Sequence, residues 1–168
     1  MVVKQATPRV KDTDMGPRLD LMTNKTAAAI GKRFYAVSLA IQDTTLPKSL
    51  QDLLMLRASQ INGCGYCIDY HSKDAQAAGE TPLRLHLVAG WRESSVFTPA
   101  ERAALALTEE GTRIADAFTG VSDATWAEAC EHFDDDQMGA LVYLVAMINA
   151  ANRLGVITRT QGGSYQPA

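Results

Sequence analysis

The stretch Ile61-Asn-Gly-Cys-Gly-Tyr-Cys-Ile-Asp-Tyr-His71 contains two of the three cysteines and one of the three histidines of this chain of 168 residues. An apolar periodic pattern runs through it and predicts a helix from about Gly63 to Ala78. In such a helix Cys64 and Cys67 are three residues apart, and Cys67 and His71 are four apart, so all three side chains share one face. A dithiol with a base beside it, at the positive end of a helix, is what thiol redox chemistry requires.

Three interpretations of this Cys-x-x-Cys pair compete: a redox dithiol, half of a zinc site, and buried structural thiols. A structural zinc ion usually has four protein ligands, and the stretch offers three, with Cys130 and His132 as no more than a remote half-site. Haem attachment requires a histidine directly after the second cysteine, where this chain has Ile68, and a thioredoxin-like fold requires strands. We therefore favour the redox dithiol and expect neither a metal nor a cofactor.

The local pattern does not choose the nucleophile. Cys64 lies nearer the helix start and gains more from the backbone amides and the helix dipole, whereas Cys67 has His71 one turn later to accept its proton. Alone, His71 would be interpreted as a surface residue of the helix. Its position four residues after Cys67 favours a functional role.

Composition narrows the class of protein. Hydrophobic residues make up 46% of the chain, and the formal charge of −3 comes from 16 basic and 19 acidic residues. No basic stripe points to nucleic acid. The longest apolar run, residues 140–151, is too short to span a bilayer, and the N-terminus has no hydrophobic signal region. We expect a cytoplasmic protein with no nucleic-acid or membrane partner, in which a close cysteine pair is more often catalytic or metal-binding than a disulfide framework.

Helical periodicity predicts an all-α bundle of about seven helices, because no stretch alternates β-branched residues. The expected helices cover residues 19–42, 47–60, 63–78, 82–89, 98–117, 122–132 and 134–154. Thr98 and Glu101 form a predicted capping box, and Ser122 and Asp134 are predicted N-caps. Residues 1–17 are predicted to be a mobile N-terminal arm, residues 18–158 a single domain, and residues 159–168 a C-terminal tail.

Leu53-Leu-Met-Leu-Arg-Ala-Ser-Gln-Ile-Asn-Gly-Cys-Gly-Tyr-Cys-Ile-Asp-Tyr-His71 resembles the core of the AhpD-like alkylhydroperoxidases of the carboxymuconolactone decarboxylase superfamily. The resemblance covers about residues 18–158. It continues through Ala89-Gly-Trp-Arg-Glu93, Glu101-Arg-Ala-Ala-Leu-Ala-Leu-Thr-Glu109 and Ile148-Asn-Ala-Ala-Asn-Arg-Leu154. This combination is far more specific than an isolated Cys-x-x-Cys.

The resemblance implies an AhpD-like helical bundle that assembles as a homo-oligomer, trimer or hexamer, with the dithiol near a subunit interface. It also implies a peroxidase in which Cys67 attacks the hydroperoxide, Cys64 closes the disulfide and His71 takes part in a proton relay. An external dithiol then reduces the pair, and in the family this reductant can be a lipoylated protein.

Two positions depart from the family pattern. Asp52 stands where the family usually has a glutamate, twelve residues before the first cysteine, and its shorter side chain would need a water to reach His71 or Cys67. The other interpretation of Asp52 is a solvent-facing residue. Tyr66 stands where the best-studied branch has a histidine, and it is expected either to supply a hydroxyl or to line the pocket.

Two other functions stay open. The superfamily's lactone decarboxylases do not need a dithiol, so the two cysteines argue against that activity. A non-enzymatic redox sensor or interaction module would use the disulfide as a switch. Outside the motif, Cys130 is expected to pack in the core, and Trp91-Arg92-Glu93 is explained equally well by a packed corner and by a site.

Overall fold

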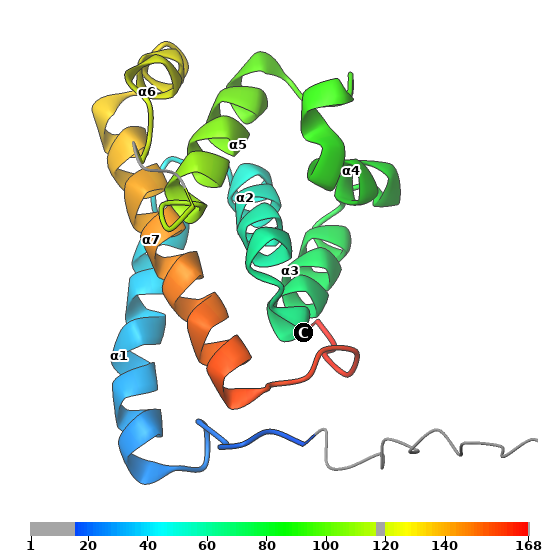
Figure 1. The fold of residues 1–168 in the computed structure, drawn as a ribbon, viewed down its shortest axis with the longest axis vertical. Coiled ribbons are helices and arrows are strands. Elements are labelled where there is room, and N and C mark those ends of the chain that lie inside the picture. Colours follow the sequence, from blue (N-terminus) through cyan, green and yellow to red (C-terminus); the bar gives the residue numbers. More distant parts are fainter. Residues whose placement is uncertain (1–15, 117–119, 168) are drawn as a thin grey trace, which may run out of the picture.

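The computed structural model describes residues 16–116 and 120–167. Within them the chain forms seven α-helices and one 3-10 helix and has no strand, which confirms the predicted all-α class (Figure 1). The elements are α1 (Lys25–Gln42), α2 (Lys48–Asn62), α3 (Gly65–Ala77), α4 (Pro82–Leu87), the 3-10 helix η1 (Val88–Glu93), α5 (Pro99–Thr112), α6 (Asp123–Cys130) and α7 (Asp135–Thr158).

Helix α2 is the centre of the bundle. It packs against α3, α5, α7 and η1, and α2 lies among α3, α5 and α7 in Figure 1. Most of its apolar side chains are buried, with Leu54 and Ala58 inaccessible to solvent. Polar residues of the same helix are buried too, among them Asp52 and Ser59. A helix with neighbours on several sides has no solvent-facing stripe, so periodicity alone could not show this.

Helix α7 is the longest element and carries much of the remaining core. Leu141, Leu144 and Ile148 are fully buried on it, and it continues to Thr158, one turn beyond the predicted end at Leu154. Among the described residues it alone is long and apolar enough to cross a membrane by length and composition. A core helix of a globular protein satisfies the same criterion, and the burial of its apolar side chains against α2 and α5 assigns it that role.

The predictions for α1 and α5 also misplace a boundary. Helix α1 begins at Lys25 rather than near residue 19, because the Asp20 carboxylate accepts the backbone N–H of Met22 at 2.8 Å and holds a turn, and Asn24 then caps the helix. Helix α5 ends at Thr112, well before residue 117. Most of the predicted N-terminal arm lies outside the described residues, as do residues 117–119.

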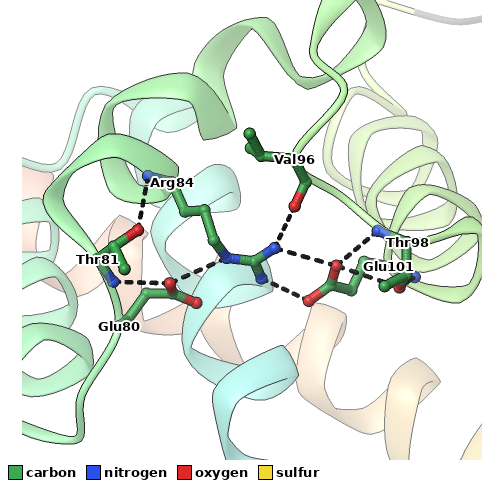
Figure 2. A network of polar contacts seen from close by, with 6 residues as sticks. All are labelled: Glu80, Thr81, Arg84, Val96, Thr98 and Glu101. Carbon is green, nitrogen blue, oxygen red and sulfur yellow. Dashed lines mark hydrogen bonds and ion pairs between the residues drawn. The ribbon is translucent and has the colours of Figure 1, made fainter.

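The C-terminal end of α3 lies away from the cysteines and leads into α4. Arg84 of α4 fixes the corner that follows (Figure 2). Its guanidinium pairs with Glu80 at 2.9 Å and with Glu101 of α5 at 2.5 Å, and also donates to the Val96 carbonyl. The predicted capping box of Thr98 and Glu101 is present. Arg84 therefore joins the start of α4 to the start of α5.

Trp91 belongs to the same region. It is buried, and the guanidinium groups of Arg92 and Arg102 lie 4.3 Å and 5.2 Å from its ring. Glu109 of α5 pairs with Arg57 of α2 and, at 3.0 Å, with Arg92. These contacts make the Trp91-Arg92-Glu93 segment a packed corner rather than part of the thiol site.

Candidate functional site around the cysteine pair

The cysteine pair lies at the junction of α2 and α3. Gly63 ends α2 in the left-handed conformation with φ of 67°, which glycine adopts without strain. Helix α3 then starts at Gly65, two residues later than predicted, and Cys64 is its N-cap. Cys64 and Cys67 form a disulfide with Cα atoms 5.3 Å apart, and the Cys64 Sγ accepts the backbone N–H of Cys67 at 3.3 Å. Both cysteines are buried.

Helix α7 closes the back of the disulfide through Gly155. A Cβ at this position would lie 2.7 Å from the Cys64 Sγ and 3.6 Å from the Cys67 Sγ. Only glycine therefore lets the α7 backbone approach the two sulfurs this closely. Because Gly155 is some 90 residues away in sequence, nothing in the motif itself points to it.

Cys67 and His71 line the same apolar cavity of about 430 Å³. Its wall also includes Tyr66 and Tyr70 of α3, so the expectation that Tyr66 lines the pocket is met. The remaining apolar lining comes from α1, α2, α7 and the segment before α1: Leu19, Leu21, Met22, Phe34, Tyr35, Met55, Met147, Ile148, Ala151 and Leu154. Such a cavity suits a small organic molecule with an apolar body.

Cys64 lies next to a different hollow. It lines a second depression of about 500 Å³, together with Gly63, Gly65, Gly155, Val156, Arg159, Thr160 and Gln161. The two cysteines of one disulfide therefore border two hollows that adjoin at Gly155 and Thr160, and only Cys67 shares its hollow with His71.

His71 is partly buried, and its Nδ1 is fully buried without a hydrogen-bond partner among the described residues. Burial, helped by the positive charge of Lys48 and opposed by Asp74, lowers the pKa of His71 to about 4. The imidazole is therefore neutral at neutral pH, and a thiolate formed beside it would favour its protonated form. The interpretation of His71 as a plain surface residue is wrong.

Asp52 is buried on α2, with 1% of its surface exposed, so its interpretation as a solvent-facing residue is wrong. One carboxylate oxygen, Oδ1, pairs with Lys48 one turn earlier, and the other, Oδ2, is buried without a hydrogen-bond partner in the described structure. Burial raises the pKa of Asp52 and Lys48 lowers it. Lys48 and Asp74 act on both Asp52 and His71, so these four groups share one electrostatic environment.

The structure gives two residues, Lys48 and Cys130, a place that the sequence did not indicate. Lys48 was not singled out as a site residue, although its place four residues before Asp52 is the ordinary spacing of an ion pair on a helix. Cys130 was expected in the core, but it is exposed at the last turn of α6, where Ala129 takes the buried position. It is not near the cysteine pair in sequence and lines neither hollow.

Comparison with known proteins agrees with this architecture. Residues 28–110 match the model of the carboxymuconolactone decarboxylase family. The uncharacterized protein YdfG of Bacillus subtilis (strain 168) is 33% identical over 123 residues, which are 73% of this chain and 82% of that protein. The uncharacterized protein YnjA of Escherichia coli (strain K12) is 29% identical over 71% of this chain and 67% of that protein.

Solved structures extend the comparison to the whole fold. A protein of unknown function from Agrobacterium tumefaciens, considered an AhpD antioxidant defence protein, superposes with a TM-score of 0.83 and 31% identity over 89% of this chain and 100% of that one. The debrominase Bmp8 shares the fold at 17% identity, with a TM-score of 0.73 over 86% of this chain and 76% of that one. The same helical frame therefore supports more than one activity. With its disulfide-forming Cys-x-x-Cys pair and its AhpD-like helical fold, the chain belongs to the carboxymuconolactone decarboxylase family.

Proposed function

We propose that the protein is a cytoplasmic thiol-dependent peroxidase that reduces organic hydroperoxides with its Cys64–Cys67 pair. The observation that carries this proposal is the placement of Cys67 and a neutral His71 on the wall of one apolar cavity. A thiolate is the reactive form of cysteine, and a neutral imidazole beside the thiol can take its proton. The apolar lining would hold the organic part of the hydroperoxide.

The reaction begins with the reduced pair. The Cys67 thiol gives its proton to His71, and the thiolate attacks the terminal oxygen of the hydroperoxide. The O–O bond breaks, the alcohol leaves with the proton from His71, and Cys67 becomes a sulfenic acid. Cys64 then attacks the Cys67 sulfur, water leaves, and the disulfide seen in the structure forms. The buried Asp52–Lys48 pair is proposed to set the local charge around His71 rather than to contact the hydroperoxide.

An external dithiol would complete the cycle. Its thiolate attacks one sulfur of the disulfide, and its second thiol then releases the mixed disulfide, so that two electrons return to the pair. The lipoyl group of a carrier protein is a dithiol of this kind. The hollow lined by Cys64 would be its approach to the disulfide.

The test is a steady-state assay of hydroperoxide consumption with dithiothreitol or reduced lipoamide as donor. We expect Cys67→Ser to reduce turnover to the uncatalysed rate. With the donor left out, Cys64→Ser should consume one equivalent of hydroperoxide per chain and stop with Cys67 as a sulfenic acid, because Cys67 has no partner to form the disulfide. Cys130→Ser is the matched control and should leave turnover unchanged, since Cys130 lines neither hollow.

Two outcomes would contradict the proposal. Full turnover in Cys67→Ser would exclude the thiol mechanism. The protein should then be assayed for lactone decarboxylation, the chemistry in the family's name, which needs no dithiol. A disulfide that forms and reduces without catalytic hydroperoxide consumption would instead identify a redox sensor.

A further inference from the structure

The C-terminal segment, residues 159–167, folds back onto α3. Arg159 follows α7 in the left-handed conformation with φ of 57° and turns the chain. Figure 1 shows the segment, in red, running from the lower end of α7 to the lower end of α3. Gly162 lies against the backbone of Gly65 so closely that a Cβ there would overlap its carbonyl. The segment therefore covers the first turn of the helix that carries the cysteines.

Two charged side chains of α3 hold this segment. Asp69 accepts the backbone N–H of Gly163 at 2.7 Å and that of Tyr165 at 3.1 Å. Lys73, one turn later, donates to the Tyr165 carbonyl at 2.8 Å and pairs with Asp69 at 2.7 Å. The hydrogen bond from Lys73, followed by those from the two backbone amides, lowers the pKa of Asp69, so the carboxylate is charged at neutral pH.

Tyr165 connects the segment to the thiol site through a row of rings. Its ring lies 4.4 Å from that of Tyr70, and its hydroxyl donates to the Asp74 carboxylate at 2.7 Å. The Tyr70 ring in turn meets the imidazole of His71 edge-on, with centroids 5.0 Å apart and an interplanar angle of 82°. Contacts of this geometry are favourable for aromatic rings. A continuous path of side-chain contacts thus runs from the segment to His71.

The orientation of the His71 ring depends on its contact with the Tyr70 ring. A histidine that serves as a base is usually oriented by a hydrogen bond from its second ring nitrogen. Here Nδ1 is buried and has no hydrogen-bond partner among the described residues. Packing against the Tyr70 ring therefore takes over the orienting role, and Tyr165 supports Tyr70 on its other side.

We propose that Tyr165 is a positioning residue of the thiol site, which holds the Tyr70 ring against His71 and so keeps the imidazole beside Cys67. The segment after α7 is then part of the site although it contributes no reacting atom. The inference deepens the proposed function and rests on it only for its consequence in turnover. Its direct consequence is a change in the proton transfer from the Cys67 Sγ to His71, in which an S–H bond breaks and an N–H bond forms.

The experiment measures this proton transfer without any peroxide. In a Cys64→Ser background, where serine retains the N-cap of α3, the alkylation rate of Cys67 by iodoacetamide is followed against pH. Tyr165→Ala removes the ring and the hydroxyl, and Tyr165→Phe restores the ring. Gln166→Ala, at the exposed neighbouring residue, is the control. The other charged groups around His71, namely Lys48 and Asp52 from α2 and Asp74 from α3, stay in place.

We expect Tyr165→Ala to move the alkylation profile by about one pH unit to higher pH, which makes alkylation about tenfold slower below the midpoint. Tyr165→Phe and Gln166→Ala should keep the parental profile. If Tyr165→Ala does not fold, as judged by circular dichroism, Tyr70→Leu removes the ring that touches His71 and should give the same displacement. An unchanged midpoint in the folded variant would overturn the inference. If alkylation were also faster at every pH, the segment would only shield the thiol. Failure of peroxide turnover in the wild type would instead contradict the proposed function alone.

Discussion

At the scale of single residues, Gly155 decides whether the two sulfurs can lie against α7. Replacing it with alanine places a methyl group 2.7 Å from the Cys64 Sγ, a separation that forces the helix or the disulfide to move. We expect Gly155→Ala to lower the free energy of unfolding of the oxidised protein by about 1–3 kcal/mol, the usual cost of overpacking. Urea denaturation followed by circular dichroism measures this change.

The control for Gly155→Ala is Gly139→Ala on the same helix. A Cβ at Gly139 meets no atom within 4 Å, so this change should stabilise α7 by about 0.5–1 kcal/mol through the lower conformational freedom of the unfolded chain. Equal effects of the two substitutions would show that the space beside the disulfide is not limiting.

The reactive residues themselves could be predicted from spacing, whereas their surroundings could not. Cys64, Cys67 and His71 are neighbours on one helix, so a three- and four-residue interval suffices to bring them together. Gly155 reaches the disulfide from a helix far along the chain, and Tyr165 reaches α3 from the segment after it. Such contacts depend on how helices pack, and a single sequence does not contain that information in its periodicity.

At the scale of elements, the end of α2 is fastened to α7 by a buried amide network. Asn62 donates to Asn149 and to Asn152 of α7, each at 2.9 Å, and Asn152 donates to Ser59 at 2.9 Å. Asn149 in turn donates to Thr112 of α5 at 3.0 Å. Because this network lies directly before the cysteines, it sets where the junction of α2 and α3 stands relative to α7.

Removing one member of this network should loosen the whole junction. Asn152 is fully buried, so Asn152→Ala leaves Asn62 and Ser59 with incomplete hydrogen bonding, and we expect a loss of about 2–3 kcal/mol in the free energy of unfolding. Arg153→Ala, at the exposed next residue, should change it by less than about 0.5 kcal/mol. A loss in Asn152→Ala no larger than in Arg153→Ala, in the same urea titration, would argue against the network.

At the scale of the whole molecule, composition and cap signals were enough for the class of fold and most helix starts. Thr98, Ser122 and Asp134 cap their helices as predicted. The predicted start of α1 near residue 19 is wrong. The pattern before Lys25 is apolar enough to continue a helix, but the Asp20 side chain stabilises a turn there instead. Local hydrogen bonds of this kind compete with helix formation.

Helix α1 also bears on the assembly of the molecule. Of its 18 residues Ile41 alone is buried, and it exposes Ile30, Tyr35, Val37 and Leu39, while α7 exposes Val142, Tyr143, Val156 and Ile157. Exposed apolar faces of this extent mark interaction surfaces. We propose that further copies of this chain cover them, in a closed homo-oligomer such as a trimer or hexamer. Since Phe34 and Tyr35 of α1 also line the cavity that Cys67 and His71 share, assembly would steady one of its walls.

Sedimentation velocity tests this assembly. The wild type should sediment as a single oligomer, and Ile30→Glu should shift it towards the monomer, because the new carboxylate would be buried without a partner in the interface. Ile114→Glu is a matched control, since Ile114 is nearly as exposed (59% against 64%) and lies beyond the end of α5 rather than on α1 or α7. If the faces of α1 and α7 steady the cavity, the Ile30→Glu monomer should also lose affinity for hydroperoxide while its disulfide still forms. A wild type that sediments as a monomer would overturn the proposed assembly.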